Sequence, residues 1–155
     1  MKDVIKVHGF SRVRLGHRDK KGKLFIDGDS GWCGPNQVVN LGFQDYLCAL
    51  LGAVAGSKQI SHMALGTGTA PGVADTSLQG ETKRLTCGNA TVASKTMRST
   101  QNFASGDHPS GTPALRNIGL FNTSSGGTLM CGNTYATSAW QSNQGVSCTY
   151  ELRFS

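Results

Sequence analysis

The chain has 155 residues, which is a size typical of one domain, and 37% of them are hydrophobic and 15% charged. Glycine contributes 21 residues, a composition that disfavours a helical bundle, while the charge is too low for a disordered chain. We therefore expect residues 1–155 to form a single domain of the mainly β class. The predicted architecture is an antiparallel β-sandwich carrying one amphipathic α-helix and an N-terminal hairpin arm.

The positive charge of the chain is concentrated at its start. The formal net charge is +6, and residues 1–24 alone account for it, because residues 25–155 contain seven basic and seven acidic side chains. Residues 1–27 are predicted to form strands with a turn at residues 19–22. Two interpretations of this segment remain open: it is an arm that docks on acidic groups, or it is a solvated hairpin. The basic residues are Lys2, Lys6, Arg12, Arg14, Arg18, Lys20, Lys21 and Lys23.

One helix is predicted, over residues 36–55. Asn36 follows Pro35 and is a plausible N-cap, and apolar residues then recur at steps of three and four up to Val54. Such a stripe predicts that the helix packs on a sheet within the sandwich of residues 28–155.

From residue 59 onward the hydrophobic period changes from helical spacing to two. Strands are predicted at residues 60–65 and 115–122, with a return strand at 128–131 and a long hairpin over 82–105. One helical turn is predicted at residues 75–78. Residues 146–155 alternate perfectly between apolar and polar side chains, so that strand is expected to bury one face only.

Few residues suggest chemistry. The four histidines lie in separate elements and no phosphate-binding loop or nucleophile motif occurs, so we expect no catalytic residue, no metal and no cofactor. The first six residues lack the apolar segment of a signal peptide, and we expect folding in a cytosol. Five widely spaced cysteines in that compartment predict free thiols, although a disulfide in a mature assembly stays open.

The sequence leaves binding functions open. Nucleic acid is not expected as a partner, because only two aromatic residues, Phe10 and Phe25, lie near the basic segment. A membrane is not expected either, because the longest apolar stretch is about half of the ~20 residues that a spanning helix needs. Trp32 and Trp140 lie in Gly/Ser-rich segments, where an indole either stacks on a sugar or anchors a loop.

Two segments together resemble small virion structural proteins of tailed bacteriophages. The first is the A-L-G-T-G-T-x-P loop, and the second is a later I-G-L-F strand followed by a turn. The residues that carry the resemblance are Gly66, Thr67, Gly68, Thr69 and Pro71 in the loop, and Ile118, Gly119, Leu120 and Phe121 in the strand. Most of these residues are expected to hold the fold together, with Gly119 permitting the close approach of another strand or subunit.

The resemblance implies a non-enzymatic protein located in the virion and assembled in the host cytoplasm. The leading expectation is a capsid cement or decoration protein whose basic arm binds the major capsid protein, with copies of itself as further partners and a trimer favoured. The alternative is a tail, baseplate or fibre-attachment protein. A carbohydrate-binding module that uses Trp32 or Trp140 is a third possibility.

Overall fold

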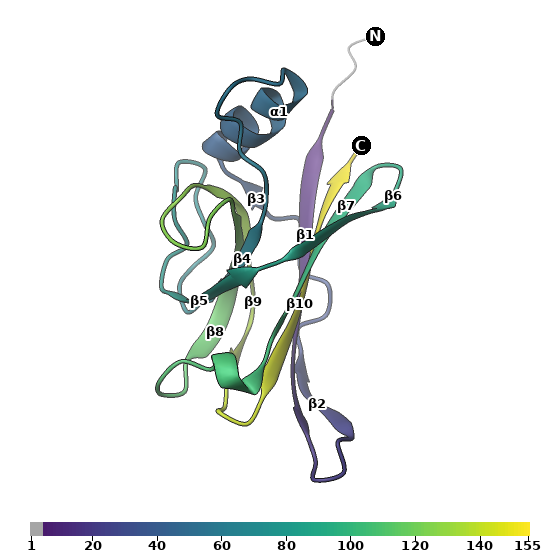
Figure 1. Cartoon of the computed structure of the whole chain (residues 1–155), viewed down its shortest axis with the longest axis vertical. Coiled ribbons are helices and arrows are strands. Elements are labelled where there is room, and N and C mark those ends of the chain that lie inside the picture. The colour runs from purple at the N-terminus through teal and green to yellow at the C-terminus, as the bar shows by residue number, and fades with distance from the viewer. Residues whose placement is uncertain (1–4) are drawn as a thin grey trace.

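The computed structural model describes residues 5–155, which form two five-stranded antiparallel sheets packed face to face (Figure 1). This arrangement confirms the mainly β class and the sandwich. The first sheet has the order β2-β1-β10-β7-β6 and the second the order β3-β9-β8-β4-β5. The strands are β1 (Val7–Arg18), β2 (Leu24–Asp29), β3 (Gln37–Val38), β4 (His62–Gly66), β5 (Glu81–Thr86), β6 (Gly88–Ala93), β7 (Thr96–Phe103), β8 (Ala114–Phe121), β9 (Leu129–Ala139) and β10 (Gly145–Phe154).

Alternation along the strands builds the core between the sheets. In β10, Val146, Cys148, Tyr150 and Leu152 point inward and are at most 2% exposed. They pack in one cluster with side chains of the facing sheet such as Leu120, as the period of two predicts. The outward face of β10 departs from the predicted pattern at Glu151, which is buried because Arg98 and Arg153 cover it.

The chain crosses between the two sheets four times, from β2 to β3, from β5 to β6, from β7 to β8 and from β9 to β10. On one side β5 ends in the second sheet and, one residue later at Cys87, β6 begins in the first sheet. The predicted hairpin of residues 82–105 is therefore divided: β6 and β7 form the hairpin, while β5 pairs with β4. On the other side, residues 30–36 run along the edge of β1, where Cys33 bridges Ser11, before the chain enters β3.

The helix predicted for residues 36–55 is shorter and begins later. Asn36 does not cap it, because its backbone N–H donates to Gly9 of β1 and the next two residues form β3. The helical segment consists of the π-helix η1 (Gly42–Cys48) followed by the single turn α1 (Ala49–Leu51). These turns lie at one end of the sandwich rather than flat on a sheet (Figure 1), so only part of the predicted apolar stripe is buried.

The segment between β4 and β5 covers the outer face of the second sheet. Residues 75–78, predicted as a helical turn, contain no helix; they form an irregular segment between turns at residues 73–74 and 79–80, and Leu78 packs against the sheet. Leu78 joins Val39, Ala64, Phe121 and Leu129 in a second apolar cluster. Both faces of the central strand β8 are consequently buried from residue 117 to its end.

The hairpin of β1 and β2 projects past the other strands at the end of the molecule opposite the helical turns (Figure 1). β1 is 12 residues long, and at about 3.3 Å per residue its two ends lie roughly 36 Å apart. Its first part pairs with β10 over residues 7–16, and its last part pairs only with β2. The hairpin is thus an extension of the first sheet with little of the body behind it.

Candidate functional site: the β1–β2 hairpin

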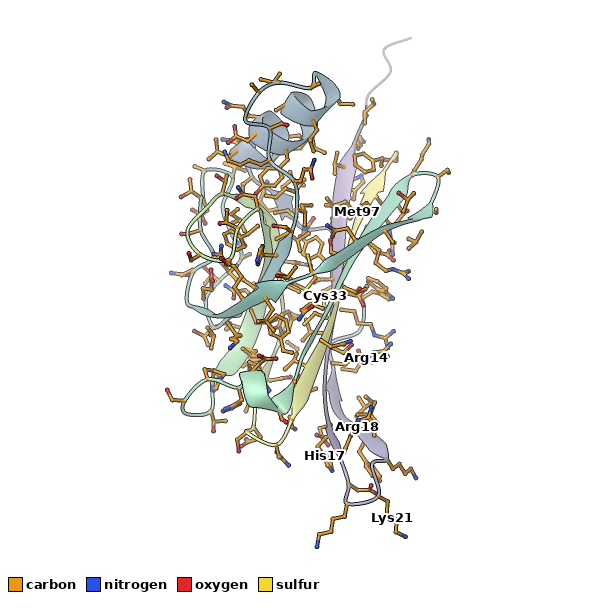
Figure 2. All side chains as sticks on the ribbon, in the orientation of Figure 1. Arg14, His17, Arg18, Lys21, Cys33 and Met97 are labelled. Atoms are coloured by element: carbon orange, nitrogen blue, oxygen red, sulfur yellow. The ribbon has the colours of Figure 1, made fainter. Side chains whose placement is uncertain are left out.

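Asp19 organises the turn at the tip of the hairpin. Its Oδ1 accepts hydrogen bonds from the backbone N–H groups of Lys21 (2.8 Å) and Lys23 (2.9 Å). Gly22 has a φ of +79°, a left-handed conformation that glycine adopts without strain. The Arg18 guanidinium donates to the carbonyl of Gly22 at 2.7 Å. These contacts fix the backbone while the lysine side chains extend into solvent, as Figure 2 shows for Lys21.

One face of the hairpin carries an aromatic and acidic cluster. The His17 ring stacks on Phe25 with centroids 5.5 Å apart, and the Lys23 ammonium lies 5.2 Å from the Phe25 centroid. The Asp27 carboxylate lies 2.9 Å from His17 Nδ1 and accepts a hydrogen bond from Gln144. These two hydrogen bonds, the one with His17 first, hold the pKa of Asp27 below its ordinary value.

At the base of the hairpin, Asp29 neutralises two of the basic side chains. Arg12 donates to both carboxylate oxygens, at 2.9 and 2.5 Å, and Arg14 Nε lies 3.2 Å from the same carboxylate. The hydrogen bonds from Arg12 are the main reason that the pKa of Asp29 falls to about 2. Arg12 and Arg14 therefore contribute less free positive charge than the sequence alone suggests.

The sequence-predicted basic residues do not form one surface. Lys2 lies outside the described residues, and Lys6 lies at the opposite end of β1, where its backbone pairs with Ser155. Within residues 5–155, the basic side chains at the tip of the hairpin have no acidic group within 4 Å. These side chains are Arg18, Lys20, Lys21 and Lys23. We call these four side chains the cationic tip.

In the body of the sandwich, by contrast, most cations have a partner. Five of the seven basic side chains in residues 25–155 form ion pairs with carboxylates: Lys58, Lys83, Arg84, Arg98 and Arg153. The two that have none are Lys95 and Arg116, which lie on different strands or turns and do not form a patch with each other. The cationic tip is thus the main concentration of unpaired positive charge in the described chain.

Apolar side chains are exposed beside the cationic tip. Leu24, Phe25 and Ile26 are 51%, 41% and 52% exposed, although they are consecutive residues of a strand. Leu24 and Ile26 line a groove between the hairpin and the nearby ends of β7 and β10, and Arg14 and Arg18 also line it. The site therefore offers cationic groups and apolar surface side by side, a combination suited to binding an acidic protein surface.

The loop of the resemblance motif is part of the packing. A Cβ atom at Gly68 would lie 2.3 Å from the carbonyl oxygen of Gln79, so only glycine fits there. The Gln79 side chain accepts hydrogen bonds from the backbone N–H and the hydroxyl of Thr69. Thr67 donates its backbone N–H to Gly80, and a Cβ at Gly66 would lie 2.8 Å from the Gly80 carbonyl.

The second motif strand is buried on both faces. Ile118, Leu120 and Phe121 are fully buried, and a Cβ at Gly119 would lie 2.9 Å from the Leu129 side chain. Gly119 thus permits a close approach, but the approaching group comes from the same chain and not from another subunit. Pro71 of the loop covers the same sheet, with its ring at the position a Cβ of Gly132 would occupy.

The two tryptophans differ in accessibility. Trp140 is fully buried: its indole N–H donates to the carbonyl of Gln144 and its ring packs against Phe103. The hypothesis that Trp140 stacks on a sugar is therefore wrong. Trp32 is 45% exposed, and the Arg153 guanidinium lies 5.5 Å from the centroid of its ring.

A second exposed apolar surface lies at the end of the molecule that carries the helical turns. It was missed from the sequence, where the helical stripe was expected to be covered by a sheet. Leu51 is 90% exposed and Ile5 80%. The side chains that line this surface are Ile5, Val7, Phe43, Leu47, Leu50, Leu51 and Phe154.

The cysteines are all free thiols, as predicted. Burial raises the pKa of Cys87 to about 11 and that of Cys131 to about 12, which makes both poor nucleophiles at neutral pH. Among residues 5–155 no group of three or more His, Cys, Asp or Glu side chains is arranged to hold a metal ion. No helix in the same range is long and apolar enough to cross a bilayer.

Comparisons with protein-family profiles, with curated proteins and with solved structures find no match to this chain. The interpretation of the site accordingly rests on its own geometry and on the two sequence motifs.

Proposed function

We propose that this protein is a structural component of a tailed-phage virion, and that it acts as a capsid cement or decoration protein. In this proposal the hairpin docks on an acidic surface of the major capsid protein. The role needs no reacting groups. It needs a rigid body and an adhesive element, and it operates by burying surface across joints between capsomers.

The observation that carries the proposal is the cationic tip. Unpaired like charges held close together repel one another, so their arrangement at the end of a fixed hairpin favours a partner of opposite charge. The exposed side chains of Leu24 and Ile26 beside the tip supply apolar area that becomes buried on docking. The choice of a phage particle as the setting rests on the resemblance of the loop at residues 64–71 and the strand at residues 118–121.

The tail, baseplate or fibre-attachment role is the alternative within the same class of protein. It uses the same adhesive hairpin against a different virion component. The number of copies per particle separates the two roles, since a shell protein is present in hundreds of copies and a tail protein in tens.

A charge-reversal experiment tests the docking step. The double variant Lys20→Glu/Lys21→Glu and the control Lys95→Glu/Arg116→Glu change the net charge equally, and all four side chains are exposed. Binding of each to capsids stripped of the protein, and to isolated tails, is measured by co-sedimentation at low and at about physiological salt. We expect the tip variant to bind at least about tenfold more weakly than the control, because two contacts of opposite charge become repulsive.

The outcomes separate the proposals clearly. Weakened binding to stripped capsids supports the cement role, and weakened binding to tails alone supports the alternative. Equal binding by the tip variant and the control would show that the hairpin is only a solvated extension of the sheet.

A further inference from the structure

The outer edge of β2 carries no neighbouring strand among the described residues. β2 is the terminal strand of its sheet and pairs only with β1. Its apolar side chains Leu24, Phe25 and Ile26 are each more than 40% exposed. An exposed apolar edge strand is a template for pairing with another strand, and such edges are normally covered or interrupted.

The hydrogen-bonding pattern of the hairpin shows which backbone groups the open edge offers. Asp19 donates its N–H to the carbonyl of Lys23, and His17 pairs with Phe25 two residues along. Hydrogen-bonded and non-hydrogen-bonded pairs alternate along an antiparallel ladder. The N–H and C=O groups of Leu24 and Ile26 therefore point away from β1, toward the open edge.

The order of side chains along this edge is self-complementary. Lys23 precedes the apolar residues and Asp27 follows them. When two copies of β2 pair antiparallel about a two-fold axis at Phe25, Leu24 faces Ile26 of the partner subunit and their backbone groups form hydrogen-bonded pairs. Phe25 faces Phe25 of the partner subunit, in a non-hydrogen-bonded pair where side chains are closest.

The same register places opposite charges at both ends of the contact. Lys23 faces Asp27 of the partner subunit, and the symmetry repeats this pair on the other side. The Asp27 carboxylate already lies near His17 Nδ1 and accepts from Gln144, but two carboxylate oxygens offer about four acceptor sites. A parallel pairing would bring like charges together instead, since Lys23 would face Lys23 and Asp27 would face Asp27.

We propose that two copies of this protein associate through their β2 edges in this register, so that their first sheets join into one continuous antiparallel sheet. A bulge limits the contact to residues 23–27. It lies between Leu15 and Gly16 of β1, where β2 has Asp27 as an extra residue, and it ends the regular edge of β2. The interface is a two-fold dimer and not the trimer expected from the sequence. It leaves Arg18, Lys20 and Lys21 unpaired, and it does not depend on the proposed virion role.

Sedimentation equilibrium of the full chain tests the dimer. We expect reversible association of the 16.3 kDa chain to twice that mass. Lys23→Asp sets two carboxylates against each other at each end of the contact, and Asp27→Lys sets two ammonium groups against each other there. Each variant alone therefore weakens association by at least about tenfold. An equimolar mixture of the two variants restores complementary pairs, and we expect it to form heterodimers within about threefold of the original affinity.

The matched control is Lys95→Asp, which makes the same charge change at an exposed residue in the turn between β6 and β7. It leaves association unchanged if the β2 edge is the interface. Circular dichroism and thermal melting confirm that each variant is folded, and recovery in the mixture distinguishes a lost contact from a lost fold. A chain that stays monomeric up to about 1 mM, a trimer, or a mixture that fails to recover overturns the proposal.

Discussion

Two carboxylates in this protein are each held by a pair of arginines, and their surroundings differ. Glu151 lies in the body on β10, is 3% exposed, and accepts hydrogen bonds from Arg98 and Arg153. Asp29 lies at the base of the hairpin and is contacted by Arg12 and Arg14, yet it stays in contact with solvent. The body thus uses ion pairs to close its surface, while the hairpin neutralises its base and leaves its tip charged.

The same contrast holds for apolar side chains. In the central strand β8, Ile118, Leu120 and Phe121 are fully buried, whereas Leu24, Phe25 and Ile26 of the hairpin are about half exposed. The contacts that hold the fold therefore lie between the sheets, whereas the hairpin contributes little to the core and presents charged and apolar groups to solvent. Substitutions of the same type in the two regions should differ sharply in cost.

The largest difference is expected for the truncation of leucine. Leu120→Ala removes a fully buried side chain between the sheets and should lower the free energy of unfolding by about 3 kcal/mol, because it leaves a cavity. Leu24→Ala makes the same chemical change at a half-exposed side chain and should cost about 0.5 kcal/mol. Urea unfolding measures both. Equal losses would mean that the hairpin is an integral part of the core.

A smaller effect is expected at the glycines of the loops. Gly68→Ala introduces a Cβ 2.3 Å from a backbone oxygen, so the loop must shift, and we expect a loss of about 2 kcal/mol. Gly106→Ala is the control, since no heavy atom lies within 4 Å of its Cβ position, and its cost should stay within about 0.5 kcal/mol. Thermal denaturation compares the two. A neutral Gly68→Ala variant would remove the packing role of the motif and leave the loop free for another role.

The elements that the sequence predicted well are those set by local period. The alternation of residues 146–155 is sufficient to predict β10, because a strand that buries one face needs every second side chain to be apolar. The concentration of charge in residues 1–24 likewise pointed to the hairpin. Pairing of Arg12 and Arg14 with Asp29 could not be predicted, since it depends on the register between β1 and β2.

The errors have a common physical cause, which is that a pattern defines a face but not what covers it. The apolar stripe after Asn36 was expected to lie on a sheet, but a hydrogen bond from Asn36 to Gly9, far earlier in the chain, draws the first residues into a strand. The remaining turns are left over the end of the sandwich. For Trp140 the sequence left open a sugar-stacking residue or a loop anchor, and packing against Phe103 of β7 with a hydrogen bond to Gln144 of its own loop makes it an anchor.

The smallest effect is expected from the acid titration of Asp29. Its pKa in the folded protein is about 2, compared with about 3.9 in an unfolded chain, so the folded state favours the ionised form. The stability this provides is fully present above about pH 4 and is lost as the pH falls toward 2. Since the pair is solvated, we expect the contribution to be about 1 kcal/mol rather than the larger value that the full shift implies.

Asp29→Asn removes this titration while leaving Arg12 and Arg14 in place. At pH 7 the variant should be about 1 kcal/mol less stable than the original protein, and between pH 4 and pH 2 the two stabilities should converge. Urea unfolding at pH 7, 4, 3 and 2 measures the convergence. A constant difference at every pH would mean that the charge of Asp29 contributes nothing and that the residue acts through hydrogen bonds such as the one it accepts from the backbone N–H of Gly31. In that case positive charge at the base would also be free for partners, and the adhesive surface would extend from the tip of the hairpin to the body.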